Sequence, residues 1–141
     1  MQSTSYMMYN KCVKQKWHVL YYESADGACP VQEFIDSRKD RDQAKIFSWV
    51  NLLEERGPDL PRPYADILTD GIHELRIKLS GDQVRILYFF CYREFIVFSQ
   101  AITKLTDAVP TPEIKRAQKY RDDFLSRYDK KKIREVLHEK L

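Results

Sequence analysis

The sequence has few glycines and prolines, three cysteines and no long apolar segment. Its 141 residues include only 4 Gly and 6 Pro, too few for a collagen-like or flexible low-complexity chain. The longest uninterrupted apolar run, residues 86–92, is far shorter than the roughly 18 residues that a membrane-spanning helix needs. The cysteines are odd in number and widely separated, which argues against a disulfide framework and against a C-x-x-C metal or redox pair. These absences exclude transmembrane, fibrous and disulfide-stapled classes.

Other absences concern export and chemistry. Residues 1–16 lack the apolar stretch of roughly 7 to 15 residues that a secretory signal contains, so we expect a cytoplasmic protein. The chain has no Gly-rich phosphate loop, no H-E-x-x-H helix and no local cluster of Cys and His with zinc spacing. It also has no G-x-S-x-G elbow for a nucleophilic serine. The sequence therefore predicts no metal and no cofactor.

The composition that remains is that of a folded domain. Apolar residues make up 43% of the chain and aromatic residues 13%. A chain of this length buries roughly two thirds of its unfolded surface, which is enough for a core without staples. We expect an N-terminal extension over residues 1–16, followed by a single domain over residues 17–141.

Periodicity and turn signals predict the order of the elements. A β-branched and aromatic run predicts an opening strand, and two helices follow that end at Gly57-Pro58. Residues 59–71 carry two prolines and Asp70-Gly71, so we expect a connector there. Three closely spaced strands and an amphipathic helix come next, and this helix either continues or is followed by a second helix near the C-terminus. The predicted ranges are strand 17–22, helices 30–38 and 41–56, strands 72–79, 83–92 and 94–104, and helix 113–128. This order indicates an α+β fold with a small, mostly antiparallel sheet, helices on one face and a C-terminal helix.

The strand at residues 72–79 presents two different faces because side chains alternate along a strand. One face takes His73 with three aliphatic residues and predicts a core; the other takes Glu74, Arg76 and Lys78. Arg85 enters the next strand on that second face, where a charge is costly unless it is paired or open to a ligand. Two interpretations follow: a salt bridge between Glu74 and either arginine, or a cationic site on a sheet face that the helices leave open.

Two further features have a structural and a functional interpretation. His73 is expected to be a packed core histidine, and the alternative is proton transfer at the edge of the cationic face. Lys130, Lys131 and Lys132 belong to a C-terminal quarter with 10 basic and 6 acidic residues. That basic segment is either a solvated helix face or an electrostatic contact for a polyanion.

Three segments together resemble the RelE/ParE superfamily of type II toxins, in particular its HigB-like, phage-derived branch. They are Gly71-Ile72-His73-Glu74-Leu75-Arg76, then Val84-Arg85-Ile86-Leu87-Tyr88-Phe89-Phe90, then Pro110-x-x-Glu113-Ile114-x-x-Ala117. The resemblance covers roughly residues 17–128. It implies a compact α+β toxin, commonly a ribosome-dependent mRNA endonuclease in which the 2′-hydroxyl attacks its own 3′ phosphate. It also implies neutralisation by a cognate helix-turn-helix antitoxin of the HigA/Xre-like type, with the ribosome and mRNA as the other partners.

The resemblance also assigns candidate site residues. Arg76, Lys78, Arg85 and Lys104 match the family's basic positions and are the predicted catalytic set. Arg85 is expected to contact the scissile phosphate, and Lys78 is the candidate base, because neighbouring cations favour the neutral form of an amine. The predicted substrate-binding residues are Gln100, Arg116 and Lys119.

One motif departs from the family pattern. The last strand usually ends in His-Gly-Phe-x-Lys-Lys, and here it reads Gln100-Ala101-Ile102-Thr103-Lys104-Leu105. This departure leaves two alternatives open: a ParE-like inhibitor of a protein target such as DNA gyrase, and a catalytically weakened, toxin-derived binding module used in regulation.

Overall fold

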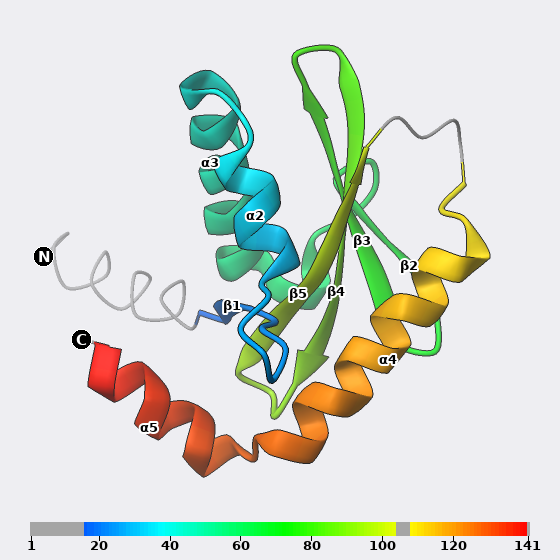
Figure 1. Cartoon of the computed structure of the whole chain (residues 1–141). Coiled ribbons are helices and arrows are strands. Elements are labelled where there is room, and N and C mark those ends of the chain that lie inside the picture. Colours follow the sequence, from blue (N-terminus) through cyan, green and yellow to red (C-terminus); the bar gives the residue numbers. More distant parts are fainter. Residues whose placement is uncertain (1–15, 104–107, 141) are drawn as a thin grey trace, which may run out of the picture.

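The computed structural model describes residues 16–103 and 108–140, apart from the side chains of residues 139 and 140 (Figure 1). Residues 1–15 of the predicted N-terminal extension therefore lie outside the described residues, and so does Lys104. The elements run in the order β1 (His18–Tyr21), α2 (Pro30–Asp36), α3 (Asp40–Arg56), the short 3-10 helix η1 (Gly57–Asp59), β2 (Ala65–Thr69), β3 (Ile72–Leu79), β4 (Asp82–Cys91), β5 (Phe95–Thr103), α4 (Thr111–Arg127) and α5 (Lys130–Lys140).

The strands form one five-stranded sheet in the order β1-β5-β4-β3-β2. β1 pairs with β5 in parallel, and the other three pairs are antiparallel. Ser80 and Gly81 join β3 to β4 with φ angles of 49° and 92°, the positive values that a tight two-residue hairpin turn requires. The predicted α+β class with a mostly antiparallel sheet is confirmed.

Helices α2 and α3 cover one face of the sheet. Their buried residues Val31, Ile35, Ile46 and Leu53 pack with the inward side chains of the strands. The strand residues of this core are Leu75, Ile77, Leu79, Val84, Ile86, Tyr88, Ile96 and Phe98. The core face predicted for residues 72–79 is therefore correct.

Helix α4 lies across the opposite face (Figure 1). Ala117 and Phe124 are buried there against a second core, and α5 adds Ile133. The strand residues of that core are Ile72, Leu87, Phe89, Cys91, Phe95 and Val97. The second face, expected to be open, is thus covered over part of its length. None of the helices in the described part of the chain combines the length and apolarity of a bilayer span.

The prediction of a connector at residues 59–71 was wrong, because this segment contains β2. The strand is only five residues long and lies at a sheet edge, between two prolines and the Asp70-Gly71 turn. The prolines and the Asp70-Gly71 turn dominate the local sequence pattern. The strand is stabilised by pairing with β3, a tertiary contact that local propensity cannot predict.

Asp42 connects α3 to the β3–β4 turn and makes stability depend on pH. Asp42 is 4% exposed, and its carboxylate accepts hydrogen bonds from Ser80 Oγ (2.7 Å) and Arg38 Nε (3.0 Å). The bond from Ser80 and the contact with Arg38 lower the pKa of Asp42 against the effect of burial. A lowered folded-state pKa contributes stability above the ordinary value of about 3.9, and this contribution is lost as the pH falls through the folded-state pKa.

We therefore expect Asp42→Asn to lower the melting temperature at pH 7 and to flatten its fall between about pH 5 and pH 2. Thermal melts followed by circular dichroism across this range measure both effects. The matched control is Asp40→Asn, an exposed carboxylate in the first turn of the same helix. Equal pH dependence in Asp42→Asn and wild type would contradict the assignment.

Candidate functional site

The cationic side chains of β3 and β4 meet on the sheet face that α4 covers only in part. Figure 1 shows the β3–β4 hairpin extending beyond the N-terminal end of α4. Arg76 of β3 and Arg85 of β4 are direct cross-strand partners, and Lys78 is opposite Gln83. We call the residues Glu74, Arg76, Lys78, Gln83 and Arg85 the cationic face. Like charges directly opposite each other destabilise a sheet, so the two arginines need a counter-ion.

Glu74 supplies that counter-ion to both arginines. Its side chain is 4% exposed, and its Oε2 lies 3.1 Å from Arg76 Nη2 and 3.2 Å from Arg76 Nε. Its Oε1 lies 3.1 Å from Arg85 Nε, an ion pair without the alignment of a hydrogen bond. The predicted salt bridge is confirmed, and one buried carboxylate holds two guanidinium groups together.

The three cationic side chains differ in how accessible they are to a ligand. The Arg85 side chain is 10% exposed, and its Nη atoms also face Val84 O at 3.3 Å and Gln83 Oε1 at 3.4 Å. The Arg76 side chain is 33% exposed, and Lys78 is exposed. An incoming anion therefore meets Lys78 and Arg76 before it meets Arg85.

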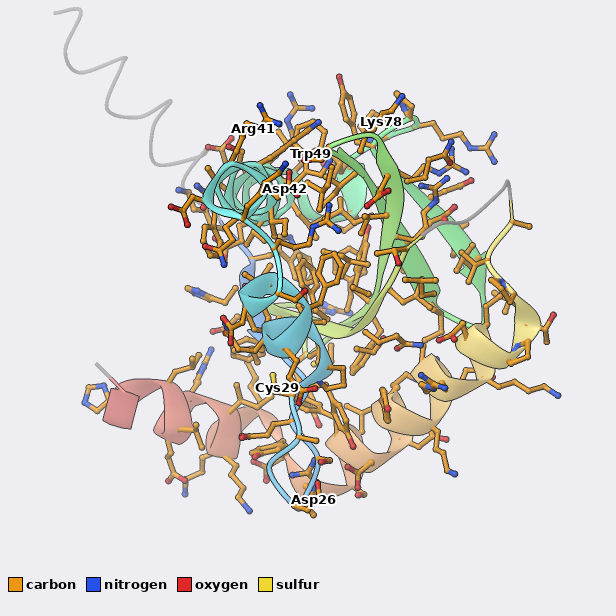
Figure 2. All side chains as sticks on the ribbon, turned by 45° about the horizontal axis from the view of Figure 1, so that its top comes forward. Asp26, Cys29, Arg41, Asp42, Trp49 and Lys78 are labelled. Carbon is orange, nitrogen blue, oxygen red and sulfur yellow. The ribbon has the colours of Figure 1, made fainter. Side chains whose placement is uncertain are left out.

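Helix α3 secures the free edge of β3 beside the cationic face. β2 does not extend along residues 76–79 of β3, and α3 side chains bind the backbone carbonyls there. Trp49 Nε1 donates to Arg76 O (2.9 Å) and Lys45 Nζ donates to Lys78 O (2.6 Å). Trp49 and Lys78 are both labelled at this edge in Figure 2. These bonds hold the backbone that carries the two exposed cations.

Gln100 reaches the same side of the sheet because β5 contains a β-bulge. Phe98 packs in the α2/α3 core, and regular alternation would place Gln100 on that face as well. The register shift opposite Leu87 and Tyr88 turns Gln100 toward α4. Its Nε2 donates to Glu113 O at 2.8 Å, and its buried Oε1 has no hydrogen-bond partner among the described residues. Glu113 also lies 3.7 Å from Arg116.

Two of the predicted residues do not join this group. Lys119 comes two residues after the buried Ala117, a rotation of about 200° that places it on the outer side of α4. His73 lies on the opposite face of the sheet, stacked on Tyr88, so its alternative role in proton transfer at the cationic face is wrong. Burial lowers the pKa of His73, and nearby Asp66 only partly opposes this effect.

Sequence reasoning missed Gln83 and Glu113, the polar side chains that complete this surface. Glu113 stood in the third segment of the family resemblance without a role in the site, because its contact with Gln100 depends on the bulge in β5. Across the described part of the chain, we find no group of three or more His, Cys, Asp or Glu residues arranged to hold a metal ion. The side chains of the cationic face offer charge stabilisation by Arg and Lys, with one amine as a candidate base.

Comparison with known proteins adds one finding. A family model described as "Phage derived protein Gp49-like" matches residues 33–122, which is more than half of the chain. The matched range begins in α2 and ends in α4, so it includes every strand except β1 and the whole cationic face. No curated protein matches the sequence.

Proposed function

Because the chain belongs to the phage-derived Gp49-like family, a RelE/HigB-like toxin-type family, we propose that it is the toxin of a type II toxin-antitoxin system that cleaves mRNA on the ribosome. We place it in the HigB-like branch and in the cytoplasm, where its substrate is translated. Its partners are a cognate antitoxin of the helix-turn-helix type, the ribosome and mRNA.

The observation that carries this proposal is the convergence of Arg76, Lys78 and Arg85 on one face of the sheet. Their Cα positions are neighbours across β3 and β4, and two of the three side chains are accessible. Arginine binds phosphate oxygens through several donors at once, so a pair held by one carboxylate is suited to a phosphodiester.

The reaction that suits these residues is transesterification within the RNA chain. The 2′-oxygen bonds to the adjacent phosphorus and the bond to the 5′-oxygen breaks, which leaves a 2′,3′-cyclic phosphate and a 5′-hydroxyl. Lys78 in its neutral form takes the proton of the 2′-hydroxyl, Arg76 and Arg85 stabilise the charge on the phosphorane, and water protonates the departing 5′-oxygen. Lys104 belongs to the proposed set by the family resemblance, and Gln100 and Arg116 contact the substrate beside α4.

One observation favours a second candidate, a ParE-like inhibitor that binds a protein target without chemistry. The Arg85 side chain is nearly buried and already faces Glu74, Val84 and Gln83. If Arg85 only supports the fold, the cationic face presents two accessible cations, Arg76 and Lys78, which are enough to bind an acidic protein surface.

Induced expression in a bacterial host without the antitoxin distinguishes the candidates. We expect wild-type protein to arrest growth and primer extension on mRNA to reveal discrete cuts within translated frames. Lys119→Ala is the matched control, since this lysine faces away from the cationic face, and it should remain as toxic as wild type. DNA-damage signalling without mRNA cuts would support the ParE-like candidate, and unaffected growth would support a binding module without toxicity.

A further inference from the structure

A cavity of about 320 Å³ lies on the other side of the sheet from the cationic face. It is formed between the segment from η1 to β2 and the ends of β3 and β4. The residues that matter below are Arg62, Asp66, His73, Tyr88 and Phe90, all of which line it. The volume falls within the range of about 300–1,000 Å³ that small-molecule sites occupy.

Three aromatic rings form one wall of this cavity. His73 stacks on Tyr88 with ring centroids 5.3 Å apart and an interplanar angle of 19°. Phe90 meets His73 edge-on at 5.0 Å and meets Tyr88 edge-on at 5.7 Å. His73 and Phe90 are only half-buried, so this aromatic cluster is not sealed inside the core. A wall of this kind suits a planar aromatic ligand.

Polar groups in the same wall lack protein partners. Neither the His73 imidazole nor the Tyr88 hydroxyl makes a hydrogen bond to any residue that the structure describes, and both residues line the cavity. Either group can therefore bond a ligand without giving up a hydrogen bond within the described part of the protein. A neutral imidazole has one donor and one acceptor nitrogen, and a tyrosine hydroxyl can act as either.

Charge at the rim limits what the cavity can accept. Arg62 and Asp66 pair at 2.8 Å, so the rim carries little net charge. The Arg62 side chain is 75% exposed and can still meet an anion outside the cavity. The interior therefore suits a neutral ring with donors and acceptors on its edge, and the exterior tolerates a phosphate.

We propose that this cavity binds a nucleobase, stacked on the His73 ring with its edge toward the perpendicular Phe90 ring and hydrogen-bonded to His73 and Tyr88, with its phosphate near Arg62. The base belongs either to a free nucleotide or to a single-stranded RNA chain. The site is separate from the cationic face and does not depend on RNA cleavage there.

Isothermal titration calorimetry on the full chain tests the proposal with AMP, GMP, CMP, UMP and a single-stranded oligoadenylate. Ribose 5-phosphate, which has the sugar and phosphate without a base, is the ligand control. We expect at least one mononucleotide or the oligonucleotide to bind, and ribose 5-phosphate not to bind. His73→Leu should weaken this binding about tenfold or more, the effect of losing one base-stacking ring. Tyr88→Phe, which keeps the ring and therefore the packing, should weaken it several-fold.

Leu125→Ala is the protein control, because this exposed residue lies on α4 across the sheet. Binding of mononucleotides identifies a free nucleotide as the source of the base, and binding of the oligonucleotide alone identifies an RNA chain. The proposal is overturned if none of these ligands binds at millimolar concentration, if ribose 5-phosphate binds as well as a nucleotide, or if Tyr88→Phe and a folded His73→Leu both bind like wild type.

Discussion

Arg76→Ala is expected to lower the rate of the proposed mRNA cleavage by about 100-fold or more, the usual cost of losing one charge-stabilising donor in a transition state. The fold should remain, because the Arg76 side chain is 33% exposed and Glu74 keeps its ion pair with Arg85. We expect a loss of unfolding free energy of no more than about 2 kcal/mol, typical of one charged hydrogen-bonding group. Cleavage of a translated message in a ribosome-containing extract and thermal melts measure the two effects.

Arg85→Ala is the comparison that separates the two arginines. This substitution removes a nearly buried cation and leaves the Glu74 carboxylate with Arg76 alone, so both the melting temperature and the cleavage rate should fall. Arg76→Ala should lower the cleavage rate with a smaller fall in the melting temperature than Arg85→Ala. If Arg76→Ala cleaves mRNA at the wild-type rate, Arg76 has no role in the proposed reaction. If Arg85→Ala is as toxic as wild type, the same holds for Arg85.

Most of the sheet could be predicted from local sequence because its central strands follow simple rules. Apolar and polar side chains alternate in β3, β4 contains a continuous apolar run, and Ser80-Gly81 marks the turn between them, so both strands were placed to within one residue. β2 could not be predicted because its stability comes from pairing with β3 and not from its own residues. The position of α4 across the second face could not be predicted either. An amphipathic stripe shows that one side of a helix is buried, but it does not show which surface that side packs against.

The part of the candidate site that depends on strand alternation could be predicted from the sequence. Alternation alone places Glu74, Arg76 and Lys78 on one face and adds Arg85 from the neighbouring strand. It cannot show that Glu74 contacts both arginines, because that depends on the cross-strand register. It also misplaces Gln100, because only the β-bulge turns this side chain away from the Phe98 face. Roles that rest on these positions, including that of Lys78 as base, remain predictions.

Glu74→Gln should change substrate binding and the chemical step in opposite directions. The carboxylate neutralises part of the charge on Arg76 and Arg85, so its removal makes the cationic face more attractive to RNA and should lower KM several-fold. The glutamine amide has one acceptor oxygen and one donor NH2 in place of two acceptor oxygens. One guanidinium group would then face a donor and lose its orientation, which should lower kcat at least tenfold. Steady-state cleavage kinetics at fixed ionic strength separate KM from kcat.

The matched control is Glu94→Gln at the opposite end of the hairpin strands. Glu94 also faces two cations, Arg134 at 2.5 Å and Lys130 at 3.7 Å, and it lies in the turn between β4 and β5. This variant should lose stability without a change in KM or kcat. A Glu74 that only supports the fold would behave like Glu94 and lower the melting temperature alone. An increase in KM in Glu74→Gln, or an unchanged kcat, would therefore refute the role of Glu74 as the residue that positions both arginines.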